Sequence, residues 1–288
     1  MKLLNFKYLN SDIGYIIRRL CKLKTNRGFL LSLILTGLLI SCEDVINVDL
    51  NDAPPQLVIE GTITNLDGPY QVRLSKSTDF YNPGINPPVT DANVEISDDA
   101  GNSEVLEGDS NGIYKSEIIK GEIGRHYTLK VNSEGEDYLA ESYMEQVVSI
   151  DSLKVEYVPG AGFIDPGYYI HCFFKDPPDT TNYYRIRAYI NGEMDEALYL
   201  VEDQFVDGNT IDYYLFFTTL QLGDTAYIEL LSMEFSVYDY YNTLSEIITF
   251  QGGGNPANPA NPNSNLSNGA LGYFGALAID RDTLILQN

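Results

Sequence analysis

Cysteine and histidine are the residues most able to do chemistry in this chain, because they act as nucleophiles, bases and metal ligands near neutral pH. The 288 residues include three cysteines and two histidines, namely Cys21, Cys42, Cys172, His126 and His171. They form no Cys-x-x-Cys pair and no H-E-x-x-H motif, so the usual zinc spacings are missing. A G-x-S-x-G elbow and a P-loop are missing as well. We therefore expect no catalytic residue, no metal ligand and no cofactor, and a protein that is not an enzyme.

Cys42 has the most informative neighbours. It follows an apolar run over residues 28–40, which has the length of a signal-peptide core and is short for a bilayer span. The run ends in Leu39-Ile40-Ser41-Cys42, which is similar to the bacterial lipobox. This resemblance implies cleavage after Ser41 and attachment of lipid to the Cys42 sulfur, with fatty acyl chains such as palmitate as a lasting membrane anchor. A plain secretory signal, or a helix that stays in the membrane, is the alternative.

The charge of the chain excludes some partners. Residues 1–41 hold seven of the 18 basic residues and one of the 41 acidic residues, and their positive segment is typical of an export signal. The rest of the chain keeps 11 basic and 40 acidic residues, a formal charge near −29. Such a charge repels nucleic acid and anionic lipid headgroups. It fits a solvated acidic surface, or a surface that attracts cations or a basic partner.

The remaining thiol and imidazoles have structural interpretations. Cys172 and His171 lie in the apolar run 168–174, which predicts a strand. Neighbouring side chains of a strand point to opposite faces, so we expect Cys172 to be an inert core residue rather than a nucleophile paired with His171. His126 stands at the start of another predicted strand, and we expect it at the surface.

One acidic segment partly resembles a calcium-binding loop. Asp109-Ser110-Asn111-Gly112 matches the beginning of such a loop, but Lys120 stands where the bidentate glutamate would be. An Asx-type hairpin turn is the other interpretation of these residues.

The first half of the chain is predicted to consist of short strands separated by turn residues. Apolar and alternating runs recur at 56–63, 70–75, 92–97, 112–118, 126–131 and 138–143. Strands at this spacing, without a helical period between them, favour an N-terminal antiparallel β-sandwich of immunoglobulin-like kind. We therefore expect a mainly β protein, with a signal peptide over 1–41, a tether over 42–55 and a β-sandwich domain over 56–150.

An aromatic-rich β domain is expected over 151–288. Its strand candidates are 153–158, 168–174, 183–190, 212–218, 225–231 and 278–286. Between the last two, Val237, Tyr241, Leu244 and Ile248 recur with the period of one amphipathic helix face, which predicts a helix near 234–250. Residues 251–265, with repeated Asn-Pro, predict an extended loop.

Aromatic side chains offer a clue to binding, since the chain has 22 tyrosines, 12 phenylalanines and no tryptophan. Tyrosine pairs occur at 168–169, 183–184, 213–214 and 240–241. In a strand, each pair sends one ring inward and one outward. The outward rings could form a recognition surface, or the tyrosines could simply fill a large β core and its rim.

A set of segments in fixed order resembles a known family. They are LVIEGTIT, GPYQVRLSKS, DANVEISDDAG, GEIGRHYTLKV, VVSIDSLKVEY, FKDPPDTTNYYRIRAY and NPNSNLSNGALGYFGA. Together they are similar to a family of Bacteroidota lipoproteins of unknown function, the domain-of-unknown-function 4249 family, usually encoded beside TonB-dependent receptors. The resemblance covers the chain after the lipobox and brings no catalytic residues with it. It implies an outer-membrane lipoprotein, and Glu43-Asp44 resembles the acidic signals of surface-displayed lipoproteins, so we expect the cell surface rather than the periplasmic face.

Two functions of different classes are open at this point. The first is a non-enzymatic binding or accessory component of a TonB-dependent uptake system. Its partners would be the membrane, through lipid on Cys42, and a TonB-dependent outer-membrane receptor, with no nucleic acid. The alternative is a surface-tethered hydrolase of polysaccharide or peptide. A deep cleft with converging carboxylates of raised pKa would favour the hydrolase.

Overall fold

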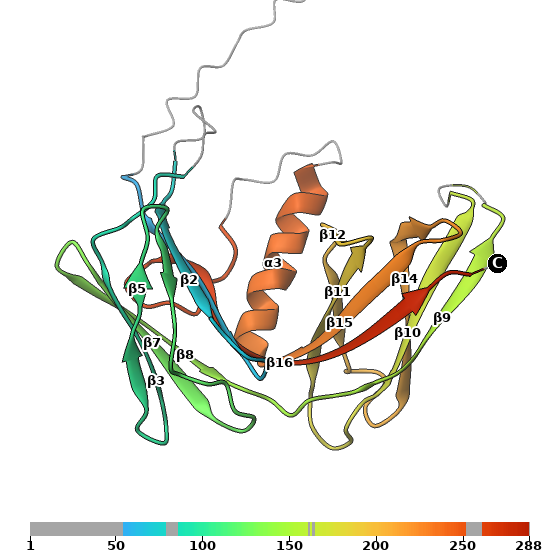
Figure 1. Ribbon diagram of the computed structural model, residues 1–288, viewed down its shortest axis with the longest axis horizontal. Coiled ribbons are helices and arrows are strands. Elements are labelled where there is room, and N and C mark those ends of the chain that lie inside the picture. The colour runs from blue at the N-terminus through green and yellow to red at the C-terminus, as the bar shows by residue number, and fades with distance from the viewer. Residues whose placement is uncertain (1–53, 79–85, 161, 163–164, 252–260, 288) are drawn as a thin grey trace, which may run out of the picture. The chain divides into compact units, whose positions relative to one another are not determined.

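Strands make up most of the chain that the structure describes (Figure 1). The computed structural model describes residues 54–78, 86–160, 162, 165–251 and 261–287, all of which belong to one compact unit over residues 52–288. The prediction of a mainly β protein with one helix after the leader is confirmed for these residues. Cys42, the leader and the tether before residue 54 lie outside them, as does most of the predicted 251–265 loop.

A long sheet runs through the whole unit, and its strands are antiparallel except for one pair. In spatial order it contains β12 (Glu193–Met194), β11 (Tyr183–Ile190), β15 (Thr225–Met233), β16 (Leu271–Ile285), β1 (Leu57–Thr64), β2 (Gln71–Lys76), β6 (Ile113–Lys115) and β5 (Glu107–Gly108), while β13 (Tyr199–Glu202) also pairs with β11.

Two smaller antiparallel sheets complete the β structure. One contains β4 (Ser103–Val105), β3 (Asn93–Asp98), β7 (His126–Ser133) and β8 (Glu136–Tyr143). The other contains β14 (Thr210–Leu220), β10 (Gly167–Lys175) and β9 (Ile150–Val158).

β16 joins the two halves of the long sheet. Its first half pairs in parallel with β1, with Val58 opposite Leu271, and its second half pairs antiparallel with β15, with Ser232 opposite Ala278. The predicted strand over 278–286 is therefore too short, because the glycine- and aromatic-rich segment before it is also strand. Gly272 makes the parallel pairing possible: its φ is +94°, and a Cβ there would clash with the Ile59 carbonyl oxygen.

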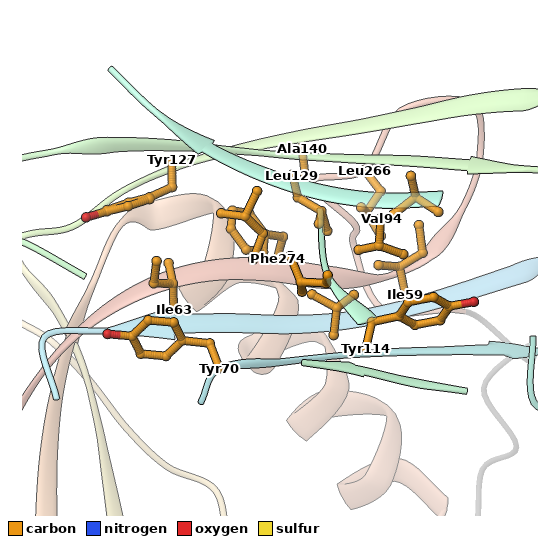
Figure 2. Packing of buried hydrophobic residues seen from close by; sticks show 14 of the residues in the cluster. Ile59, Ile63, Tyr70, Val94, Tyr114, Tyr127, Leu129, Ala140, Leu266 and Phe274 are labelled. Carbon is orange, nitrogen blue, oxygen red and sulfur yellow. The ribbon is translucent and has the colours of Figure 1, made fainter. Parts of the chain in front are cut away.

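The first core lies between the four-stranded sheet and the β16-β1-β2-β6 part of the long sheet. Ile63 and Leu129 have no exposed surface, and Phe274 from β16 is buried with them. Figure 2 shows these side chains facing one another, with Phe274 between the strands of the two sheets. The proposed boundary between domains 56–150 and 151–288 stays a prediction, but β16 of the second range contributes to the core of the first.

The second core lies between the three-stranded sheet and the β11-β15 part of the long sheet. Phe174 and Tyr184 meet there with their ring centroids 5.1 Å apart. Both strands obey the period-two rule, since every second residue of β10 from Ile170 onward and of β11 from Tyr184 to Ala188 is buried.

The predicted helix is confirmed as α3 (Phe235–Gln251), which packs on the opposite face of β11, β15 and β16. Val237 and Tyr241 are buried and Leu244 is partly buried, as the apolar period predicts. Ile248 departs from it, with 57% of its surface exposed. No helix among the described residues is long and apolar enough to cross a membrane.

Candidate functional site

The residues that the sequence singles out do not converge on one site. Cys42 lies outside the described residues. Cys172 is fully buried in β10, where burial raises the pKa of its thiol to about 12. His126 is exposed at the first position of β7, and its ring lies 4.8 Å from that of Tyr143. The Asx-type turn is present at Asp109, whose carboxylate accepts the N–H groups of Asn111 and Ile113.

His171 lies on the opposite face of β10 from Cys172, as predicted. Its Nδ1 is 2.8 Å from Asp212 Oδ1 on β14, and its Nε2 is 3.3 Å from Glu156 Oε2 on β9. The imidazole therefore lies between two carboxylates from the strands on either side and is hydrogen-bonded to Asp212, whereas its buried Nε2 has no hydrogen-bond partner among the described residues.

Aromatic rings surround this histidine and define what we call the aromatic face, the outer face of the β14-β10-β9 sheet. It consists of Tyr169, His171 and Phe173 on β10, Tyr214 and Phe216 on β14, and the charged residues Lys154, Glu156 and Asp212.

Contacts within β14 and between β14 and β10 join the rings of the aromatic face into one group. Tyr214 lies 5.3 Å from Tyr169, 4.9 Å from His171 and 6.4 Å from Phe216, measured between ring centroids. From β9, which flanks β10 on the side away from β14, the Lys154 ammonium lies 4.5 Å above the Phe173 ring of β10. Such separations suit offset and edge-to-face ring contacts and a cation–π contact.

The tyrosine pairs of the strands place their two rings on opposite faces of the sheet, but the outer ring is not always exposed: Tyr169 is 2% exposed, and Tyr183 packs against α3. Tyr169 and Tyr214 share the outer face, while Tyr168 and Tyr213 pack against the second core. Tyr240 and Tyr241 are an exception, because they lie on a helix and both are buried.

A cluster of three aspartates lies at the end of the same sheet. Single carboxylate oxygens of Asp176, Asp203 and Asp207 lie within 4.8 Å of one another, and the first two residues are buried. Burial raises the pKa of the Asp203 carboxyl; the Asn182 N–H opposes this, and the neighbouring Asp176 and Asp207 charges add to the rise. Carboxylate oxygens are the ligands that Ca²⁺ and Mg²⁺ prefer.

Hydrogen bonds within the protein already account for the positions of these aspartates. Asp176 accepts the Tyr184 hydroxyl at 2.5 Å and the Gly208 N–H at 3.0 Å. Asp203 accepts the N–H of Asn182 at 2.9 Å, and Asp207 accepts the N–H of Asp179 at 3.0 Å. The cluster thereby ties the 176–182 and 203–208 loops together without requiring an ion.

An open hollow of about 580 Å³ lies elsewhere, where α3 begins beside β8. Its lining includes Glu141, Glu234 and Ser236, and it contains none of the three clustered aspartates. Glu234 Oε2 accepts the Tyr143 N–H at 3.2 Å, so one carboxylate of the hollow serves to join α3 to β8. Two carboxyl groups among the described residues have a raised pKa: Asp203 lies in the aspartate cluster, and the pKa of Glu145 is raised by burial and by the charge of Glu234, which lines this hollow. The hydrolase therefore stays an alternative.

The sequence matches the model of a known protein family. A family model described as "Domain of unknown function (DUF4249)" matches residues 43–283. No curated protein matches the sequence.

Proposed function

The chain belongs to the DUF4249 family, whose function is unknown, and from this premise we propose that it is a non-enzymatic binding component of an uptake system. In this proposal it is anchored to the outer membrane by lipid on Cys42, with its body at the cell surface. Its partner is a TonB-dependent receptor, which the aromatic face contacts. The observation that carries the proposal is the aromatic face itself, a group of rings on the outer side of a sheet. Phe216 is exposed, His171, Phe173 and Tyr214 are half-buried, and Tyr169 is buried beneath them.

The composition of the aromatic face supports protein binding over other uses. Phe216 is 49% exposed, and tyrosine and phenylalanine supply contact area at small entropic cost. Lys154, Glu156 and Asp212 surround the rings with charges of both signs, as at the rim of a protein interface. The absence of tryptophan lowers the value of this surface for stacking sugars.

We also propose the finer architecture that favours this function. The first core and its sheets would form an immunoglobulin-like sandwich that acts as a spacer next to the tether. The part with the aromatic face would then be the part that meets the receptor.

The direct test is co-purification of the lipidated protein with an outer-membrane β-barrel receptor after mild solubilisation. Phe216→Ala should weaken the complex, since truncation of a central aromatic anchor costs about 2 kcal/mol or more, or about 30-fold in Kd. Phe205→Ala is the matched control, because Phe205 is 91% exposed and lies outside the aromatic face.

Equal loss in both variants, or no loss in Phe216→Ala, would contradict the role of the aromatic face. Cleavage of a glycan or peptide by the purified body, abolished by acidic-to-amide changes, would replace the proposal with the hydrolase.

A further inference from the structure

Three arginines gather on the face of the long sheet that also carries α3, although the chain is strongly acidic. They are Arg185 and Arg187 on β11 and Arg281 on β16. Basic residues are scarce, at 18 against 41 acidic residues in the whole chain. Three positive charges on one face of so acidic a protein therefore need a physical explanation.

One cross-strand row holds two of these arginines around a single carboxylate. Arg187 is in register with Glu229 of β15, and Glu229 is in register with Arg281. Glu229 is 2% exposed, and its Oε2 lies 2.6 Å from an Arg187 terminal nitrogen. Its Oε1 accepts from Arg281 Nε at 3.0 Å and lies 2.9 Å from a terminal nitrogen of the same side chain. One negative charge is thus shared by two positive charges.

Arg185 adds a third positive charge without a matching carboxylate. It lies two residues before Arg187 and so on the same side of β11, about 7 Å away along the strand. Its guanidinium carbon is 4.3 Å from the centre of the Tyr241 ring of α3. Among the described residues, no carboxylate forms an ion pair with it, and the buried Nε atoms of Arg185 and Arg187 have no hydrogen-bond partner.

Most N–H groups of the three guanidinium groups therefore have no acceptor among the residues that the structure describes. Each has five N–H donors in a planar fork that matches the oxygens of a carboxylate or a phosphate. Arg281 uses Nε and one terminal nitrogen on Glu229, and Arg187 uses one terminal nitrogen. Arg281 is also accessible, with 44% of its side chain exposed.

We propose that Arg185, Arg187 and Arg281 form a binding site for a small oxyanion, a carboxylate or phosphate group of a ligand. Glu229 fixes the forks of Arg187 and Arg281, and Tyr241 fixes that of Arg185. The rings of Tyr189 and Tyr227, 5.7 Å apart, flank the row and would contact the body of the ligand. This site is separate from the aromatic face and does not depend on the proposed receptor contact.

The overall charge limits the size of the ligand. An acidic surface repels a long polyanion such as nucleic acid or an anionic membrane, because both bring many charges outside the arginine row. A small oxyanion places its charge only where the positive charge is locally in excess. Binding should weaken with added salt, as expected for a partly exposed charge pair.

Calorimetric titration of the whole lipid-free chain, residues 43–288, with inorganic phosphate and with tricarballylate tests the proposal and distinguishes the two oxyanion sources. We expect at least one probe to bind, and Arg185→Gln to weaken its binding at least tenfold. Arg125→Gln is the matched control: it removes the same charge, but Arg125 pairs with Glu122 and Asp99 far from the row. It should leave binding within about twofold of the unchanged protein.

The titrations can refute the proposal in two ways. No binding of either probe, or equal binding by Arg185→Gln and the unchanged protein, would overturn it and leave the row with a purely structural role. Far-UV circular dichroism establishes that each variant is folded. If Arg185→Gln does not fold, Arg185→Lys decides, because lysine keeps the charge and loses the fork. An undiminished affinity in that variant would refute recognition by the planar fork.

Discussion

Gly61 and Phe274 should be energetically coupled, because they meet where β1 and β16 pair in parallel. A Cβ built on Gly61 would lie 3.2 Å from Phe274 Cδ2 and 3.1 Å from Val72 Cγ2. Both distances are short for carbon atoms, and Phe274 has no exposed surface through which its ring could move aside. Gly61→Ala should therefore destabilise the fold by overpacking, at about 1–3 kcal/mol.

Phe274→Ala should be the larger single perturbation. Removal of a fully buried phenylalanine ring costs about 3–5 kcal/mol, which combines lost burial with the cavity that remains. The cavity would open next to Gly61, so the methyl group of Gly61→Ala would lose one of its two close contacts. The contact with Val72 would persist, and we expect the double variant to be about 1 kcal/mol more stable than the sum of the single effects predicts.

Urea denaturation of the lipid-free chain, followed by far-UV circular dichroism and tyrosine fluorescence, measures all four proteins of this cycle. Equal m-values would show that the same surface is exposed in each unfolding transition. Effects that add to within about 0.5 kcal/mol would refute the contact between Gly61 and Phe274. A neutral or stabilising Gly61→Ala would refute the close packing of β1 against β16.

Three further predictions concern anchoring, thiol chemistry and acidity. Cys42→Ala should abolish palmitate labelling and release the protein from membranes, and a variant that stays in the membrane fraction with unchanged mobility would contradict lipidation. Cys172, whose buried thiol has a pKa of about 12, should react with a disulfide reagent at pH 8 only after unfolding, and rapid labelling of the native protein would contradict its burial. The N–H groups of Ile113 and then Asn111 lower the pKa of Asp109, so its contribution to stability should be present at pH 7 and lost as the pH falls through the lowered value. The difference in urea midpoint between the unchanged protein and Asp109→Asn should therefore shrink below about pH 4, and a difference independent of pH would disprove this role.

Local features of the fold could be predicted from the sequence because their causes are local. The period of Val237, Tyr241 and Leu244 predicts α3, and the alternation in β10 predicts that Cys172 and His171 face opposite ways. Asn191-Gly192 predicts a tight turn, and both residues have the positive φ that such a turn needs, at 53° and 87°.

The candidate sites could not be predicted because they depend on which strands are neighbours. His171 meets Glu156 and Asp212 only because β10 lies between β9 and β14 in one particular register. Glu229 meets Arg187 and Arg281 for the same reason. These residues are far apart in sequence and carry no shared motif, and carboxylates are too frequent in the chain for their types alone to suggest a partner.

The pairing of β16 with β1 also explains why removal of residues 56–148 would be a poor way to isolate the second part of the protein. That deletion would take away β1 and expose Phe274, Ala276 and Ala278 of β16. Loss of binding after such a deletion could reflect damage to β16, so substitutions on the aromatic face are the cleaner experiment.

The same pairing has a consequence for when the protein can fold. The Gln56 side chain donates to the Gly269 carbonyl across 213 positions of sequence, and β1 finds its parallel neighbour only in the last strand of the described chain. A chain that emerges amino end first, from a ribosome or through a translocation channel, must therefore wait with one edge of β1 unpaired until β16 arrives. Contacts of such long range slow folding and favour an open chain during transit, and they leave a bare strand edge that is open to aggregation.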